Sequence, residues 1–149
     1  MTLLRSIKTA VAGAALVLAA VFTATTALAG PPAPFGASQQ VTGNWGNEVY
    51  DVTVSNLAPT GDGHWYADVT MHAIKGNPSP HIGAFTAIAA DGTRYNAVLG
   101  NNPDGLPTGP LPQGQTRSGK IYFGVLGGPA PDSISFTPVA TNDYLLWKG

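Results

Sequence analysis

Residues 65–73 read WYADVTMHA, and their side chains alternate between apolar and polar along the whole stretch. A period of two places successive side chains on opposite faces of a β-strand, so one face is expected to be buried and the other to meet solvent. A turn at residues 60–63 (TGDG) precedes the stretch, and Gly76-Asn77-Pro78 ends it because proline lacks the amide hydrogen that pairing needs. Trp65 begins the apolar face and, like Trp147 near the C-terminus, is expected to lie in the core.

Shorter runs with the same period lie before and after this stretch. The runs cover residues 50–55, 85–89, 94–99, 120–125, 134–136 and 144–147. Asp91-Gly92 separates two of them and is a strong signal for a β-hairpin. No segment shows a sustained helical period. The pattern indicates an all-β sandwich or small barrel of about seven or eight short strands.

The N-terminus has the three parts of an export signal. Arg5 and Lys8 form a basic region, Val11–Phe22 is apolar, and Ala27-Leu28-Ala29 is an A-x-A cleavage site. The apolar stretch is shorter than the roughly 20 residues that a membrane-spanning helix needs. We therefore predict that residues 1–29 are a cleaved signal peptide and that the chain is secreted without a stable membrane anchor.

Composition restricts the chemistry of the remaining chain. The 149 residues include no cysteine, which excludes disulfides, a thiol nucleophile and thiolate metal ligands. Loss of the signal peptide leaves five basic side chains against eight acidic ones, a formal charge of −3, so nucleic acid is not an expected partner. Residues 30–38 (GPPAPFGAS) have the composition of a flexible leader, and residues 39–149 are expected to form the domain.

No motif in the chain points to catalysis, a cofactor or a metal. His64 and His72 fall on one face of the same expected strand but about 26 Å apart, too far to share an ion. G-x-S-x-G and the glycine-rich phosphate loops are absent. We therefore predict a non-catalytic chain without cofactor or metal. Two alternatives stay open: a secreted hydrolase whose site is assembled by folding from scattered Asp, Glu and His residues, and a structural component of the cell envelope.

Partner binding is the remaining function to locate. Two tyrosines occupy the polar phase of their strands, and exposed aromatic side chains often anchor partners. Gly100–Thr116 (GNNPDGLPTGPLPQGQT) is the one long irregular stretch, and such loops are usually either functional or disordered. The amide and acidic residues near its start are typical of a turn and lack the calcium-loop pattern. The residues that we predict to bind a partner are Tyr66, Tyr122, Asn101, Asn102 and Asp104.

Several blocks of sequence carry a family likeness. They are T-x-x-A-I-K-G at 70–76 with Pro80 beyond, F-x-A-x-x-A-D-G-x-x-Y at 85–95, P-Q-G at 112–114, G-K-I-Y-F-x-V at 119–125 and L-L-W at 145–147. This set resembles the mycobacterial secreted immunogenic protein family over about Val52 to Trp147. The resemblance implies an immunoglobulin-like β-sandwich, export through a cleaved signal peptide and recognition by the host as an antigen. It brings no catalytic or cofactor residues. The segment up to Asn47 matches poorly, and the loop at Gly100–Leu111 looks longer than in the family.

The combined expectation is an immunoglobulin-like antiparallel β-sandwich of about seven or eight strands, preceded by a signal peptide. Its expected role is that of a secreted, antigen-like, non-catalytic module that binds a protein or cell-envelope partner. The sequence does not identify that partner and predicts no oligomeric state.

Overall fold

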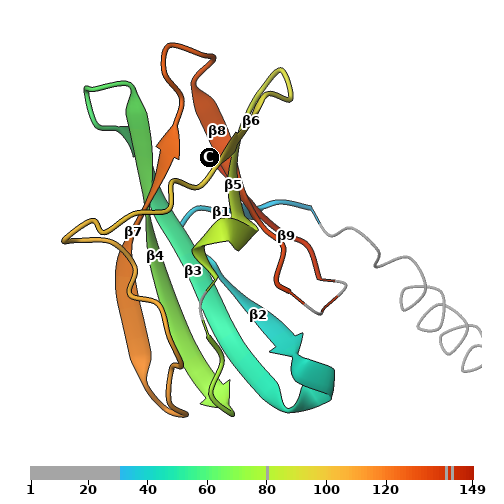
Figure 1. The fold of residues 1–149 in the computed structure, drawn as a ribbon. Coiled ribbons are helices and arrows are strands. Elements are labelled where there is room, and N and C mark those ends of the chain that lie inside the picture. The colour runs from blue at the N-terminus through green and yellow to red at the C-terminus, as the bar shows by residue number, and fades with distance from the viewer. Residues whose placement is uncertain (1–30, 80, 140, 142) are drawn as a thin grey trace, which may run out of the picture. The chain divides into compact units, whose positions relative to one another are not determined.

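The structure is a computed structural model that describes residues 31–79, 81–139, 141 and 143–149. The predicted signal peptide, residues 1–29, lies outside the described residues. Nine strands and two short 3-10 turns make up the described fold (Figure 1). They are β1 (Ala33–Pro34), β2 (Ser38–Gly43), η2 (Asn44–Gly46), β3 (Glu48–Pro59), β4 (His64–Lys75), η3 (Ile82–Ala84), β5 (Phe85–Ala89), β6 (Arg94–Asn96), β7 (Thr116–Gly124), β8 (Pro131–Phe136) and β9 (Leu145–Lys148). In this part of the chain, no helix is both long and apolar enough to cross a membrane.

The strands form two sheets that enclose one hydrophobic core. One sheet has the order β2-β3-β4-β7 and the other the order β1-β9-β8-β5-β6. Buried residues of both sheets belong to the same core cluster. Within one sheet, the rings of Phe85 and Phe136 have their centroids 4.4 Å apart at an interplanar angle of 35°. The predicted all-β sandwich is thus confirmed. One pairing departs from the antiparallel prediction, because β1 and β9 run parallel.

The strand count exceeds the prediction because two N-terminal strands carry little apolar pattern. β2 reads SQQVTG, in which Val41 is the only large apolar side chain, and β1 has two residues. These strands also change the predicted domain boundary. Ala33 and Pro34, inside the segment predicted as a flexible leader, pair with Trp147 and Lys148. The sandwich therefore begins at Ala33 rather than at residue 39.

β4 has the alternation that its sequence predicts. Its inward-facing side chains are fully buried in the core from Ala67 to Ala73, whereas the intervening ones remain partly exposed. Trp147 is 0% exposed, as predicted for a core residue, and its indole N–H donates to the Ala37 carbonyl at 2.8 Å. Trp65 was predicted to lie in the core but is only partly buried, at the second position of β4.

The long loop at Gly100–Thr116 is part of the sandwich. In Figure 1 it runs beside β7, in yellow to orange. The Leu106 amide donates to the Lys120 carbonyl at 2.9 Å, and the Lys120 amide donates to the Asp104 carbonyl at 2.8 Å. Leu106 and Leu111 are buried in the core. Of the two alternatives that the sequence left open for this loop, disorder is wrong, because the loop supplies core side chains and pairs with the edge of β7.

Arg117 fixes the middle of the same loop. Its guanidinium donates to the carbonyl oxygens of Pro107, Gly109 and Pro110 at 3.3, 2.8 and 3.1 Å. A guanidinium offers several donors in a rigid planar fork, so one side chain can hold several carbonyls at once. The loop thereby presents its first residues, Asn101 to Asp104, in a defined position next to the outer face of β7.

Candidate partner-binding face

The two predicted tyrosines form a pair on the outer face of the β2-β3-β4-β7 sheet. Tyr66 on β4 lies opposite Tyr122 on β7 in the strand register, and their ring centroids are 6.3 Å apart at an interplanar angle of 47°. The Lys120 Nζ atom lies 5.0 Å from the Tyr66 ring centroid, within cation–π range. Both rings are partly exposed. The sheet therefore presents two tilted aromatic rings to solvent with a cation beside them.

The loop adds an acidic side chain to this pair. The Tyr122 hydroxyl donates to Asp104 Oδ1 at 2.7 Å, and Lys120 Nζ lies 3.9 Å from Asp104 Oδ2. On the other side, Lys120 Nζ lies 3.3 Å from Asp68 Oδ1. We call the group Tyr66, Asp68, Asp104, Lys120 and Tyr122 the tyrosine face. It carries two carboxylates and one ammonium group.

The carboxylates of the tyrosine face raise the pKa values of Tyr122 and Lys120. The hydrogen bond to Asp104 is the main cause that raises the pKa of Tyr122 to about 12, because ionising the phenol would remove the donated proton and place two negative charges side by side. Asp68 raises the pKa of Lys120 above its ordinary value. The phenol and the ammonium group therefore stay protonated at neutral pH and remain donors.

Two hollows flank the tyrosine face. One, of about 360 Å³, is lined by Asn102, Asp104 and Tyr122 together with the turn before β4. The other, of about 290 Å³, lies on the loop side and includes Asn101, Asn102 and Tyr122 in its lining. Concave surfaces with a few polar groups are the usual setting for binding.

The structure thus brings the predicted set together around one loop and two strands. Tyr66, Tyr122 and Asp104 are linked through the ring pair and the hydrogen bond to the loop. Asn102 lies in both hollows, and Asn101 lies in the loop-side hollow without lining the other. The set is contiguous. Whether it binds a partner stays a prediction.

Sequence reasoning missed Lys120 and Asp68 as members of this surface. They face each other because β4 and β7 are neighbours in a register that pairs Asp68 with Lys120. The two strands are separated by about forty residues of sequence and belong to no hairpin, so no local signal gives that register. The alternation alone does place both side chains on the outer face.

The turn before β4 holds the arrangement that comes nearest to a catalytic one. The Thr60 hydroxyl donates to Asp62 Oδ1, and His64 Nδ1 lies 3.2 Å from the same oxygen. The hydrogen bond from Thr60, followed by that from the His64 amide, lowers the pKa of Asp62 to about 2. A nucleophile–base pair needs the hydroxyl on the imidazole, whereas here both groups contact the carboxylate. The geometry is that of a turn held by its own side chains.

No metal site is built from the described residues. Among them, no three His, Asp or Glu side chains lie close enough together to hold an ion. His64 and His72 lie on the same strand as predicted, and His72 Nδ1 contacts the Thr116 hydroxyl at 2.9 Å.

Comparison with known proteins places the chain in a family. Residues 32–147 match the model of a domain of unknown function (DUF1942). The chain is 34% identical, over an alignment of 160 residues that covers 99% of both proteins, to the immunogenic proteins MPB63 of Mycobacterium bovis and MPT63 of Mycobacterium tuberculosis.

Solved structures agree with the fold. The crystal structure of a secreted protein from M. tuberculosis, MPT63, superposes with a TM-score of 0.68 at 28% identity and covers 81% of this chain and 100% of that one. The yjhA protein of Bacillus subtilis shares the fold at 16% identity, with a TM-score of 0.59 and coverage of 78% and 98%. The resemblance stated from the sequence blocks is thereby confirmed. The family-model match over residues 32–147 makes this chain a member of the DUF1942 family, and the 34% identity over the whole chain makes it a relative of the mycobacterial immunogenic proteins MPB63 and MPT63.

Proposed function

We propose that the chain is a secreted, non-catalytic, antigen-like module that binds a protein partner through the tyrosine face. The observation that carries the proposal is the hydrogen bond between Tyr122 and Asp104, which joins the exposed ring pair of the sheet to the start of the loop. Tyrosine is enriched at protein interfaces because its ring gives a large contact area and its hydroxyl a hydrogen bond at low entropic cost.

The rigidity of the loop supports this proposal. Leu106 anchors the loop in the core, and Arg117 holds its middle, so the loop does not have to be ordered when a partner arrives. A pre-organised surface loses less conformational entropy on binding. The mature formal charge of −3 favours a protein over nucleic acid.

Export is supported by the family members rather than by the described part of the chain. The MPT63 structure is that of a secreted protein, and the curated relatives are immunogenic proteins. If the chain is exported by the predicted signal peptide, mass spectrometry of the culture filtrate will find a product that begins at Gly30. A product that retains Met1 and stays with the cells would contradict this.

A non-catalytic role is supported by the state of the side chains in the 360 Å³ hollow. There, the Asp62 carboxylate is occupied by its own turn, and its lowered pKa makes it a poor general acid. Tyr122 donates its proton to Asp104. A hydrolase site in this hollow would have to use these groups, so it predicts a loss of activity in an Asp104→Asn variant on any substrate that the secreted chain hydrolyses there.

Site-specific crosslinking tests the binding proposal. The full chain is expressed in a mycobacterium with the photoreactive residue p-benzoylphenylalanine replacing Tyr66 or, as the control, Gln40. Gln40 is exposed on β2 of the same sheet and lies outside the tyrosine face. We expect a protein adduct from position 66 that is absent from position 40 and is weakened by Tyr122→Ala. Adducts of equal strength at both positions, or adducts with envelope lipid or glycan alone, would overturn the proposal.

A further inference from the structure

A second surface, distant from the tyrosine face, has no role in the proposal above. Residues Asn44, Trp45 and Gly46 form η2 between β2 and β3, and their φ angles are 48°, 55° and 84°. Positive φ angles are unfavourable for residues that carry a β-carbon, and tryptophan is an unusual residue to adopt one. The Trp45 side chain is nevertheless 97% exposed. Neither the backbone strain nor the exposed indole is explained by packing within the fold, and such strain is typically kept where it serves function.

The turn that carries Trp45 is held in place by the end of β4. Lys75 Nζ donates to the Gly46 carbonyl at 2.8 Å, and the Asn47 amide donates to the Asn44 carbonyl at 3.0 Å. Gly76, at a φ of +73°, lies so close that a β-carbon there would be 2.5 Å from the Asn47 carbonyl oxygen. The exposed indole is therefore presented on a fixed support.

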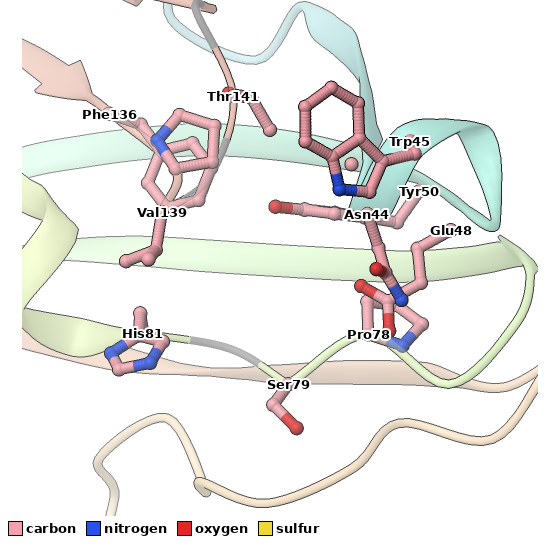
Figure 2. Close-up of a pocket in the computed structure, with 12 residues that line it drawn as sticks. Asn44, Trp45, Glu48, Tyr50, Pro78, Ser79, His81, Phe136, Val139 and Thr141 are labelled. Carbon is pink, nitrogen blue, oxygen red and sulfur yellow. The ribbon is translucent and has the colours of Figure 1, made fainter.

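A pocket of about 270 Å³ opens beside this turn. Figure 2 shows the Trp45 indole at one rim, across from Val139 and Phe136, with the hydroxyl end of Tyr50 pointing into the space between them. Glu48 and His81 also line it. We call this site the tryptophan pocket. It lies at the end of the sandwich where β4 finishes, about 30 Å along that strand from Tyr66.

The charged groups around the tryptophan pocket give it a negative character. Glu48 is the one carboxylate in the lining, no Lys or Arg lines the pocket, and Glu48 makes no salt bridge within the described part of the chain. Burial, together with the charges of Glu48 and Asp143, raises the pKa of Tyr50 to about 12. Lys75, the basic group that holds the turn, is bound to the Gly46 carbonyl and lies outside the lining.

From this geometry we propose that the tryptophan pocket binds an arginine side chain of a protein partner, with the guanidinium stacked on the Trp45 indole and paired with the Glu48 carboxylate. The face of an indole is electron-rich and attracts cations, and arginine adds planar stacking and two parallel hydrogen bonds to a carboxylate. The Tyr50 hydroxyl faces the same space and can orient the partner chain. A sugar would also stack on the indole but would gain nothing from the unpaired charge of Glu48, so the charge favours the cation.

Titration with small probes tests this site without knowledge of the partner. The mature chain is titrated with N-acetyl-arginine amide, with the isosteric but uncharged N-acetyl-citrulline amide, and with N-acetylglucosamine, while NMR follows the Trp45 indole N–H and the Gly46 amide. We expect saturable shifts of both signals with the arginine probe, weakened at high salt, and at least tenfold weaker binding of the citrulline probe.

Two variants and a matched control complete the test. Glu48→Gln and Trp45→Ala should each weaken binding of the arginine probe about tenfold or more, because one removes the charge and the other removes the ring. Asp91→Asn removes one carboxylate at the distant β5–β6 hairpin and should leave binding unchanged. Trp45 is outside the core, so its variant is expected to fold. Equal binding of the arginine and citrulline probes, binding of N-acetylglucosamine alone, or no shift with any probe would each overturn the proposal.

Discussion

Leu106 of the long loop crosses so closely over Gly119 of β7 that a β-carbon on Gly119 would lie 2.5 Å from the Leu106 backbone nitrogen. The side chain of residue 119 would point inward, in the same phase as Ile121 and Phe123. Its absence leaves room for the backbone of the loop, and Leu106 can then enter the core. The position of the loop, and with it the position of Asp104 in the tyrosine face, therefore depends on a glycine in the neighbouring strand.

Replacing Gly119 should displace the loop from β7 and destabilise the fold. In Gly119→Ala the new methyl group meets backbone atoms of Gly105 and Leu106, which cannot move like a flexible side chain. We expect the free energy of unfolding to fall by about 1–3 kcal/mol in urea denaturation, as is typical when a packed site is overfilled. Gly124→Ala is the matched control on the same strand, because the nearest heavy atom to its β-carbon is at an ordinary 3.9 Å. Equal effects of the two substitutions would refute the role of the close approach.

The core side chain of the loop should matter as much as its backbone. Leu106 is 2% exposed, so Leu106→Ala should lower the free energy of unfolding by about 2–5 kcal/mol. Leu99 immediately precedes the same loop and is 73% exposed, so Leu99→Ala should change the free energy of unfolding by less than about 0.5 kcal/mol. Thermal denaturation of both variants checks the difference. A deletion of residues 101–110 would remove the same core contact, so partner-binding tests need point substitutions in the exposed part of the loop.

The sequence predicted the sheets better than their edges. The apolar phase of β4 from Ala67 to Ala73 is visible without a structure because a period of two is a local property. β1 is not visible in this way, because its pairing with β9 uses backbone groups across more than a hundred residues and the segment has the composition of a linker. The loop was ambiguous for a related reason. Leu106 looks like any other loop residue until Gly119 is known to leave space for its backbone.

The candidate site could be predicted only in part, because its contacts depend on the pairing of strands that are distant in sequence. Alternation alone places Tyr66 and Tyr122 on the outer face, but their contact and the salt bridge between Asp68 and Lys120 need the register of β4 and β7. Trp45 could not be singled out, because a tryptophan in a short polar stretch gives no indication whether it will be buried. Its exposure follows from the left-handed turn, which only the structure shows.

Acid should weaken the turn at residues 60–64 in a defined pH window. The pKa of Asp62 is lowered from 3.8 to about 2 by the hydrogen bonds from Thr60 and His64, so its charged form is favoured in the folded state. A lowered pKa adds stability above the unfolded-state value, and this contribution is lost as the pH falls from about 4 to 2. The stability difference between the wild type and Asp62→Asn should therefore be constant from pH 5 to 7 and shrink below pH 4. A difference that does not depend on pH would contradict this origin. In Thr60→Val, which removes the largest cause, NMR titration should show the pKa of Asp62 nearer to 3.8.

The link between the sheet and the loop can be measured directly through Tyr122. Its pKa of about 12 arises first from the hydrogen bond to Asp104, and burial and the charge of Asp104 add to it. Asp104→Asn removes the negative charge and replaces the carboxylate acceptor by a weaker neutral amide, so the largest cause that opposes the phenolate is weakened. We expect the pKa of Tyr122 to move from about 12 toward 10, as followed by ¹³C NMR of the labelled tyrosines between pH 8 and 13. Asp132→Asn removes a carboxylate that pairs with Lys148 on the other sheet and serves as the control. An unchanged Tyr122 titration in Asp104→Asn would mean that Asp104 does not contact Tyr122 in solution. The proposed binding surface would then lose the carboxylate that the loop contributes.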